Sequence, residues 1–171
     1  RSAVIEEFIV GAQFNFNFFC SPLSQEIELV GTDTRRQTSL DGLLRLPAPQ
    51  QMELLKHVSP TYVEVGHVAS TVRESLLQKA FDAAEKLVEA AKKEFAPGII
   101  GAFALQAAIV TQDGKEKIIV FDLSLRIPGS PGVTATPYTH YLYGESVSYG
   151  RRIAMEIKDA VRLNRLQDVV T

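Results

Sequence analysis

The residues best suited to chemistry lie in a predicted hairpin that spans residues 102–126. Asp113-Gly114 is a strong turn signal, and a three-residue loop over Asp113–Lys115 with a left-handed glycine sets Gln106 directly opposite Asp122. A two-residue loop would shift the register by one residue and break this pairing. Because amide and carboxylate oxygens are ligands for a hard divalent cation, the pair predicts a site for a metal-bound nucleotide.

Alternation gives this hairpin one apolar face and one small, polar face. The apolar face comprises Phe103, Leu105, Ala107, Ile109, Phe121 and Leu123, and the polar face comprises Ala102, Ala104, Gln106, Ala108, Asp122, Ser124 and Arg126. A solvated face would usually carry Lys, Glu or Thr, whereas small residues around a few polar groups leave room for a ligand. We therefore expect the first face in the core and the second beside a pocket.

Composition indicates an ordinary globular protein that forms one domain, or one large piece of one. The 171 residues are 46% hydrophobic and 22% charged, with a net charge of −2 and a pI near 6.0. Scattered basic residues give no footprint for nucleic acid, and no apolar run is long enough to span a membrane. Cys20 is the only cysteine, which excludes an internal disulfide and favours a reducing compartment, so we expect a cytoplasmic location.

The first part of the chain reads as an antiparallel meander with strands at residues 4–10, 13–19 and 26–30. Asn15 and Asn17 alternate with phenylalanines, which indicates either a solvated sheet surface or the wall of a polar pocket; the pattern slightly favours the surface. Residues 31–51 read as a long polar loop in which adjacent arginines could bind a phosphate. An exposed loop with surface ion pairs is the favoured interpretation of that segment.

Two helices are predicted to support the strands. The first opens with a capping box from Thr71 to Glu74 and stops at Pro97-Gly98. The second covers residues 149–164, and its inward face is expected to carry Ile153, Ile157, Ala160 and Val161. Arg151 and Arg152 in its first turn oppose the helix dipole, so each should have a carboxylate or phosphate partner.

Residues 127–137 contain prolines and glycines that predict an irregular loop beside the polar face of the hairpin. Backbone N–H groups in such a loop can approach a phosphate or a carboxylate. His57, His67 and His140 lack the spacing of a zinc motif and a visible nucleophile partner, so none is assigned a catalytic role.

Several segments carry a family resemblance that covers nearly the whole chain. They are VIEEFIVGAQFNFNFF, DTRRQTSLDGLLRLP, TVRESLL, FALQ with VFDLSLR, and PYTHYLYGESVSYGRRIAMEIKDAV. Together they resemble the carboxy-terminal half of the archaeal formate-dependent FAICAR synthetase (PurP) family, most specifically at RESLL and GRRIAMEI. The resemblance implies an ATP-grasp ligase that joins formate to AICAR at the expense of ATP, through formyl phosphate, in purine biosynthesis. It also implies an archaeal, cytoplasmic enzyme.

The resemblance assigns roles to residues that the pattern alone left open. It implies ATP-binding positions at Glu6, Glu7, Phe8, Ile9 and Gln13, positions near the AICAR substrate at Arg35, Ser39 and Asp41, metal ligands at Gln106 and Asp122, and a catalytic cation at Arg126. The expected cofactors are ATP and Mg²⁺, with Mn²⁺ as a substitute. Catalysis would rest on positioning and charge neutralisation, as in other phosphoryl transfers.

The expected architecture is α+β, an ATP-grasp carboxy-terminal domain with a mostly antiparallel sheet and two principal helices packed against it. Residues 1–171 would form the carboxy-terminal part, with an amino-terminal domain and an ATP lid upstream, so we expect the chain alone to be inactive. A homo-oligomer is expected, with Tyr138, Tyr141 and Tyr143 as exposed interface residues.

Two alternative functions follow from departures from the family pattern. The family usually has glutamate where Asp122 stands, and residues 127–137 differ from the family loop. The first alternative is a PurP-like paralogue that acts on another small carboxylate or amine. The second is a non-catalytic module for nucleotide binding or assembly.

Overall fold

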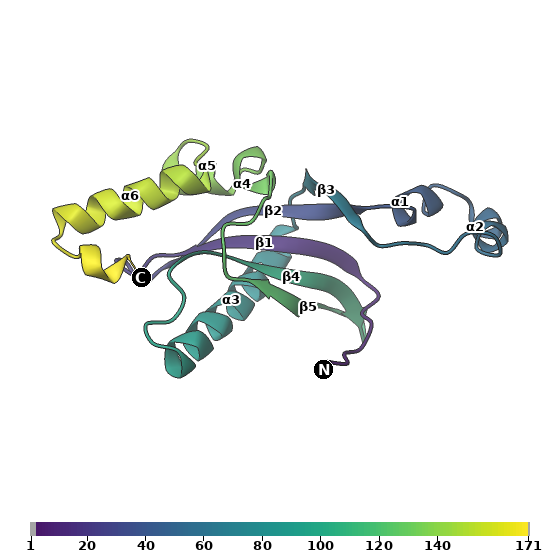
Figure 1. Ribbon diagram of the computed structural model, residues 1–171, viewed down its shortest axis with the longest axis horizontal. Helices are drawn as coiled ribbons and strands as arrows, with labels where there is room; N and C mark the ends of the chain where they lie inside the picture. Colours follow the sequence, from purple (N-terminus) through teal and green to yellow (C-terminus); the bar gives the residue numbers. More distant parts are fainter. Residues whose placement is uncertain (1–2, 171) are drawn as a thin grey trace.

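The computed structural model describes residues 3–170 and contains one five-stranded sheet in the order β3-β2-β1-β4-β5 (Figure 1). All neighbouring strands are antiparallel. The strands are β1 (Ala12–Cys20), β2 (Ile27–Gln37), β3 (Glu64–Ala69), β4 (Gly101–Gln112) and β5 (Lys115–Ser124). β1 lies in the centre of the sheet, so both of its edges are occupied.

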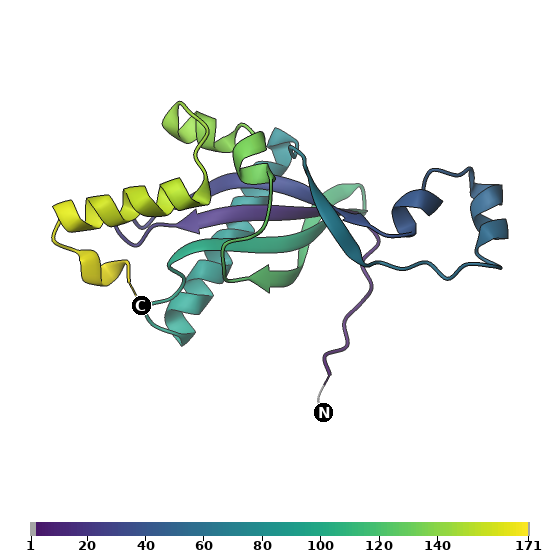
Figure 2. The same cartoon turned by 45° about the horizontal axis from the view of Figure 1, so that its top comes forward.

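Helices cover the sheet on both faces (Figures 1 and 2). Helix α3 (Glu74–Glu94) packs on one face, and α6 (Tyr149–Arg162) lies on the other together with the short helices α4 (Gly132–Ala135) and α5 (Tyr138–Tyr143). A 3₁₀ turn, η1 (Leu166–Asp168), follows α6. The predicted α+β class, with an antiparallel sheet and two principal helices, is confirmed.

The main core lies between the sheet and α3. The phenylalanines at alternate positions of β1 meet the apolar face of β4, and the rings of Phe18 and Phe103 stack with centroids 5.4 Å apart. Helix α3 contributes Leu76, Ala80 and Ala84 to this layer. The helix begins at Glu74 without a side-chain cap, so the predicted capping box from Thr71 does not form.

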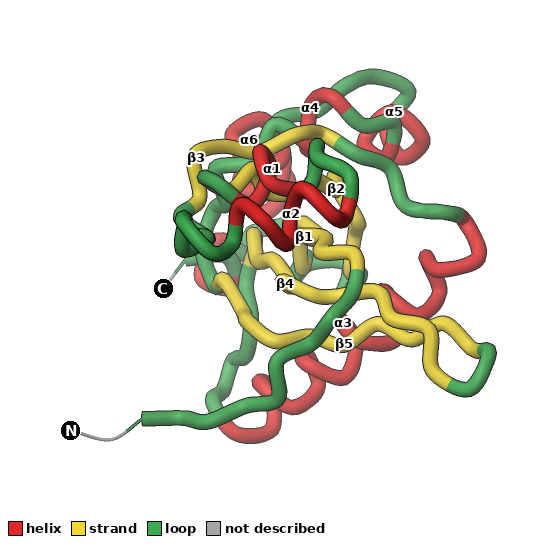
Figure 3. The backbone as a smooth tube through the Cα atoms, turned by 90° about the vertical axis from the view of Figure 1, so that its right-hand side faces the viewer, coloured by secondary structure: helices red, strands yellow, loops and turns green. Residues whose placement is uncertain are grey.

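The first 60 residues depart from the prediction. Residues 4–10 form no strand: the segment is exposed except at Ile9, borders β4 and β5 at residues 110–112 and 119–121, and then leads away from the rest of the domain towards the N-terminus (Figures 2 and 3). Residues 31–37 belong to β2 rather than to a loop, because residues 31–33 pair with β1 and residues 33–37 pair with β3. The two short helices α1 (Leu40–Leu43) and α2 (Ala48–Leu54) form an arm beyond β2 and β3 (Figure 1).

The β4–β5 hairpin forms the predicted Gln106–Asp122 pairing, but with a different turn and a bulge. Its turn has two residues, Asp113 and Gly114, both at positive φ, as a type I′ turn requires. The expected three-residue loop is therefore wrong. A bulge at Phe121 then restores the register, so that Gln106 pairs with Asp122 as predicted. Because of this bulge, Ile118 and Val120, rather than Phe121, pack against the core.

Helix α6 is held to the sheet by a buried ion cluster. The Arg152 guanidinium donates to both oxygens of Glu28, at 2.7 and 2.8 Å, and to Glu156 at 2.7 Å. It also lies 4.1 Å from the centroid of the Phe19 ring. Ser21 donates to the second oxygen of Glu156 at 2.6 Å. Burial lowers the pKa of Arg152, but the two glutamates outweigh it and raise the pKa above its ordinary value.

The cluster changes the expected inward face of α6. Arg152 and Glu156 are buried, whereas Ile157 and Val161 are 41% and 61% exposed. The predicted inward face is therefore confirmed for Ile153 and Ala160, which pack or are buried, and is wrong for Ile157 and Val161. The expectation that the first-turn arginines have partners is confirmed, because Arg151 pairs with Glu145 at 2.6 Å.

The three tyrosines around α5 are not a common exposed surface. Tyr138 is buried and accepts a hydrogen bond from the backbone N–H of Val72 at 3.2 Å. Tyr143 donates to Glu28 at 2.5 Å, and only Tyr141 is largely exposed. The predicted exposure is therefore wrong for Tyr138 and only partly met by Tyr143, and the interface role stays a prediction. None of the helices in residues 3–170 is long and apolar enough to cross a bilayer.

We predict that Arg152→Ala lowers the free energy of unfolding by about 3–5 kcal/mol, because it leaves the buried Glu156 and the mostly buried Glu28 without a counter-charge. Arg151→Ala is the matched control: it removes the neighbouring arginine from an exposed ion pair and should cost less than about 1 kcal/mol. Urea denaturation of both variants measures the difference. Equal losses would show that the buried cluster does not hold α6.

Candidate functional site

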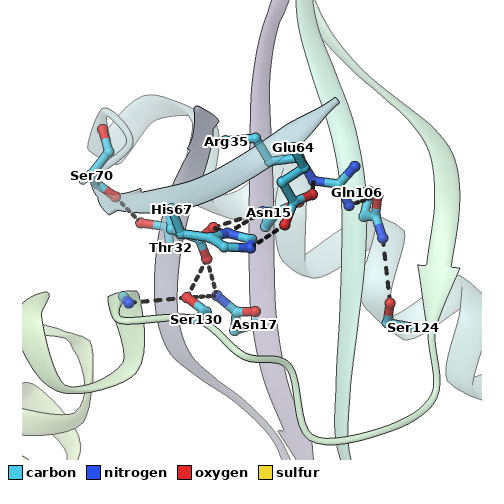
Figure 4. Close-up of polar contacts among 12 residues, drawn as sticks. Asn15, Asn17, Thr32, Arg35, Glu64, His67, Ser70, Gln106, Ser124 and Ser130 are labelled. Atoms are coloured by element: carbon cyan, nitrogen blue, oxygen red, sulfur yellow. Dashed lines mark hydrogen bonds and ion pairs between the residues drawn. The ribbon is translucent and has the colours of Figure 1, made fainter. Parts of the chain in front are cut away.

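A polar pocket of about 120 Å³ lies on the sheet face opposite α3 (Figure 4). Adjacent strands and the segment after β5 supply its walls. The polar residues that line it are Asn15 and Asn17 of β1, Asp33 and Arg35 of β2, Glu64 and His67 of β3, Gln106 of β4, Ser124 of β5, and Arg126 and Ser130. Of the two interpretations of the asparagine face, the pocket wall is the one that the structure shows.

Asp33 is the centre of the hydrogen-bond network in this pocket. Its side chain is fully buried, and both of its oxygens accept hydrogen bonds. Asn15 donates to Oδ1 at 2.7 Å, Asn17 donates to Oδ2 at 2.9 Å, and Ser130 also donates to Oδ2. His67 Nδ1 lies 2.5 Å from Oδ1. Side chains of β1, of β3 and of the segment after β5 therefore converge on one carboxylate of β2.

Two opposing effects set the pKa of Asp33. Burial raises it, but the hydrogen bonds from Ser130, Asn15, Asn17 and His67 stabilise the ionised form and together lower the pKa below its ordinary value. A carboxylate at the base of the pocket is consequently ionised at neutral pH.

A second chain of contacts crosses the pocket from β3 to β4. Glu64 contacts His67 Nε2 at 2.6 Å with one oxygen and Arg35 Nε at 2.8 Å with the other. The Arg35 guanidinium donates to Oε1 of Gln106, whose amide nitrogen donates to Ser124 at 3.3 Å (Figure 4). The oxygen of Gln106 that was predicted to bind metal thus already accepts a hydrogen bond from a cation.

The predicted site residues fall in three places. Arg35, Gln106 and Arg126 line the pocket, and Asp122 is exposed beside Gln106 on the neighbouring strand. Ser39 and Asp41 lie on the arm, where the Ser39 hydroxyl accepts from Thr61 N–H and Asp41 pairs with Arg36 at 2.6 Å. The structure therefore does not bring these two residues to the pocket.

The predicted ATP-binding residues lie towards the opposite end of the hairpin. Residues 6–10 border a groove with residues 110–112 and 119–121. Gln13 is exposed on β1, two positions before Asn15, and so lies on the same face as the asparagines. The predicted nucleotide positions therefore lie outside the polar pocket, and their role stays a prediction.

Sequence reasoning missed Asp33, Glu64, His67 and Ser130. Asp33 and Arg35 alternate at a period of two, which would have placed both on one face had residues 31–37 been recognised as strand. Residues 64–69 were not predicted as a strand at all. His67 gave no signal because its partners are distant in sequence or on the unrecognised strand.

Ser130 is placed by a close backbone approach between Gly132 and β2. A Cβ atom on Gly132 would lie 2.3 Å from the backbone oxygen of Thr32, and one on Gly31 would lie 2.5 Å from the backbone of Gly132. The Gly132 N–H donates to Ser130 Oγ at 3.0 Å. Helix α4, within the segment predicted to be irregular, thereby fixes the hydroxyl that contacts Asp33.

Comparison with solved structures defines the class of this domain. The crystal structure of an IMP biosynthesis protein PurP from Thermococcus kodakaraensis matches with a TM-score of 0.75 and 36% identity, over 96% of this chain and 50% of that chain. This likeness confirms the predicted ATP-grasp class. The carboxy-terminal position of the chain within a longer protein stays a prediction.

The chain belongs to the family described as "Domain of unknown function (DUF1297)", which matches residues 1–171. Its relatives include proteins named 5-formaminoimidazole-4-carboxamide-1-(beta)-D-ribofuranosyl 5'-monophosphate synthetase, from Methanobrevibacter smithii (41% identical) and Methanocaldococcus jannaschii (38% identical). Each match covers 99% of this chain and 46% of the relative. The chain therefore spans about half the length of the curated relatives that it matches.

We predict that Gly132→Ala destabilises the protein and displaces Ser130, because its Cβ would meet immobile backbone. The expected loss is about 1–3 kcal/mol of unfolding free energy, as for other overpacked positions. Gly129→Ala, three residues away, is the control, because a Cβ there meets nothing within 4 Å. Thermal denaturation of both variants measures the loss. A Gly132→Ala protein as stable as the control would contradict the close approach.

Because the pKa of Asp33 is lowered in the folded protein, the free energy of unfolding should decrease at acid pH. Its contribution is present above the unfolded-state pKa of about 3.9 and is lost as the pH falls through the lower folded-state pKa. At pH 7 we expect the free energy of unfolding of wild type to exceed that of Asp33→Asn by about 1–3 kcal/mol. The reason is that the asparagine amide cannot accept hydrogen bonds from all of the donors around it. Urea denaturation between pH 7 and 2 should show this margin narrowing below pH 4. A constant margin would contradict the prediction.

Proposed function

We propose that this chain is part of an ATP-dependent carbon–nitrogen ligase of purine biosynthesis, which joins formate to AICAR to give FAICAR through an acyl phosphate. The observation that carries the proposal is the match of 99% of the chain to proteins named as synthetases of that product, at 38–41% identity. The pocket on the polar sheet face supports it, because it gathers two arginines around a site large enough for a small anionic group.

Arg35 and Arg126 are the residues that we assign to anionic substrate groups. Both are permanently charged, and both line the pocket, Arg35 from β2 and Arg126 from the segment after β5. Arg35 is already oriented by Glu64 and Gln106. Arg126 follows β5 and would steady the transferring phosphoryl group. Ser39 and Asp41 lie on the arm, so they can contact AICAR only if the arm and the pocket bind the same ligand.

The chain also offers residues for Mg-ATP, with Mn²⁺ as a substitute. Gln106 and Asp122 face each other across β4 and β5 and present oxygen atoms, the donor type that Mg²⁺ prefers. The metal would neutralise charge on the phosphates, with water and ATP oxygens as further ligands. Glu6, Glu7, Phe8 and Ile9 would contact the nucleotide through the groove beside β4, and Gln13 would contact the ribose.

The wider setting of the protein is part of the same proposal. The relatives come from methanogens, and we propose a cytoplasmic enzyme that binds small-molecule substrates rather than nucleic acid or membrane. We also propose that it assembles as a homo-oligomer. Because the chain covers 46% of its relatives, we propose that the isolated 171 residues do not turn over; robust FAICAR formation by them would contradict this.

The decisive assay incubates the natural full-length protein with formate, AICAR and ATP and measures FAICAR and ADP. We expect Gln106→Ala, Asp122→Ala and Arg35→Ala each to lower kcat/KM by about 100-fold, a typical cost of removing an electrostatic contact to the transition state. EDTA should abolish activity, and added Mg²⁺ should restore it.

Arg73→Ala is the control variant, because Arg73 pairs with the exposed Glu116 outside the pocket. It should keep wild-type kinetics. Absence of FAICAR with wild type would contradict the proposed reaction, whereas wild-type activity in the Gln106, Asp122 and Arg35 variants would show that the site is assigned to the wrong residues.

One observation favours a second candidate, a nucleotide-binding module without ligase activity. The Gln106 oxygen accepts a hydrogen bond from Arg35, and Asp122 is exposed, so the metal position lacks a buried carboxylate. Titration calorimetry with ATP in the presence and absence of Mg²⁺ separates the candidates. Metal-independent affinity together with no product would favour the binding module.

A further inference from the structure

Asn17 carries a buried hydrogen-bond acceptor that the fold does not use. Its side chain is fully buried in the wall of the polar pocket, and its Nδ2 donates to Asp33 Oδ2 at 2.9 Å and to Ser130 Oγ at 3.2 Å. Within residues 3–170, no group donates a hydrogen bond to its Oδ1. Native proteins rarely leave a buried amide oxygen without a donor, so this atom points to a donor on a bound ligand.

The contact with Asp33 determines which way the Asn17 amide faces. A carboxylate oxygen only accepts hydrogen bonds, so the NH₂ end of the amide must face Asp33. The amide oxygen therefore faces away from Asp33 and Ser130 (Figure 4). On the neighbouring strand β4, Asn17 pairs with Ala104, a pocket residue whose small side chain leaves space beside that oxygen.

The same pocket holds a second unused buried atom, which is a donor. Within the described part of the chain, Arg35 Nε has no hydrogen-bond partner: it lies 2.8 Å from a Glu64 oxygen, but its N–H is not directed at that oxygen. An ionised carboxylate or phosphate only accepts hydrogen bonds, so it could satisfy Arg35 but not Asn17. A primary carboxamide satisfies both residues, because its NH₂ group donates and its carbonyl oxygen accepts.

We propose that Asn17 is a specificity-determining residue: its Oδ1 accepts a hydrogen bond from the carboxamide NH₂ group of the substrate, whose carbonyl oxygen accepts from Arg35 Nε. The pocket volume of about 120 Å³ suits one such group rather than a whole ligand, which typically needs about 300–1,000 Å³. The inference rests on the proposed function for the identity of the substrate, AICAR, which carries a carboxamide on its imidazole ring. A carboxylate in its place is disfavoured, because its oxygen would face the Asn17 oxygen.

The first test needs no nucleotide. Imidazole-4-carboxamide, which has the amide but neither the ribose phosphate nor the amine of AICAR, is titrated into the full-length protein, and the NMR signal of the Asn17 side-chain NH₂ is followed. We expect this signal to shift with the carboxamide and not with 4-acetylimidazole, in which a methyl group replaces the NH₂. No shift with the carboxamide, or equal shifts with both compounds, would overturn the proposal.

The second test compares, by calorimetry on the full-length protein, AICAR with the analogue in which a methyl group replaces the carboxamide NH₂. Wild type should bind the analogue about 10- to 100-fold more weakly, because the buried acceptor loses its donor. Asn17→Ala should distinguish the two ligands by less than about threefold, because the acceptor itself is gone. Equal affinity of wild type for both ligands would overturn the proposal without any variant.

Asn15→Ala is the matched control. Asn15 also donates to Asp33, at 2.7 Å, but it has no buried side-chain atom that lacks a partner. Loss of this donor should affect both ligands alike, so the ratio of their affinities should stay that of wild type. The wild-type ratio in Asn17→Ala would show that Asn17 only holds Asp33, and would overturn its role in specificity.

A second analogue, with a methyl group in place of the ring amine of AICAR, separates the two nitrogen groups of the substrate. Wild type and Asn17→Ala should distinguish it from AICAR equally well. A difference between the two proteins here would assign the Asn17 oxygen to the amine and overturn the carboxamide assignment. Failure of wild type to bind AICAR would instead count against the proposed function, and the titration with imidazole-4-carboxamide would still decide the role of Asn17.

Discussion

Asp33 imposes the main constraint on the polar half of this domain. An ionised carboxylate with no exposed surface is strongly unfavourable unless donors surround it, because its lost hydration costs several kcal/mol. The donors come from β1, from β3 and from the segment that follows β5. The edge strand, the central strand and the loop that closes the pocket are therefore held together at one side chain.

The opposite face of β1 is stabilised by apolar packing alone. Its phenylalanines meet β4 and α3 in an apolar layer that needs only shape and volume to match. A strand that alternates phenylalanine with asparagine can lie at the centre of a sheet only when both faces are satisfied. One face is satisfied by packing and the other by hydrogen bonds, which is why Asn15 and Asn17 are buried together with Phe16 between them.

What the sequence could predict depended on the range of the interactions involved. The amphipathic helices and the Gln106–Asp122 pairing follow from local period and turn chemistry, although the pairing arises from a short turn and a bulge instead of a longer loop. The strand at residues 64–69 was missed because its own sequence carries no clear strand pattern, and its strand conformation depends on pairing with β2. For the same reason, the Asp33–His67 contact, between residues 34 positions apart, could not be anticipated.

The polar interior of α6 shows a different limit. Periodicity assigns aliphatic residues to a buried face, but the partner surface contains Glu28, which no local pattern of α6 encodes. Arg152 is buried because it pairs with Glu28, and Glu156 is buried because it pairs with Arg152 and accepts a hydrogen bond from Ser21, whereas Ile157 and Val161 are left at the surface. Long-range charge pairing has overridden the apolar stripe.

The arm formed by α1 and α2 has a consequence for local stability. Neither helix contains a buried residue, so little apolar contact opposes their opening. Native-state hydrogen exchange depends on such local opening equilibria, which range from almost zero free energy up to that of global unfolding. Amide protons of residues 40–55 should therefore exchange with solvent much faster than those of β1, which exchange only when the whole sheet unfolds.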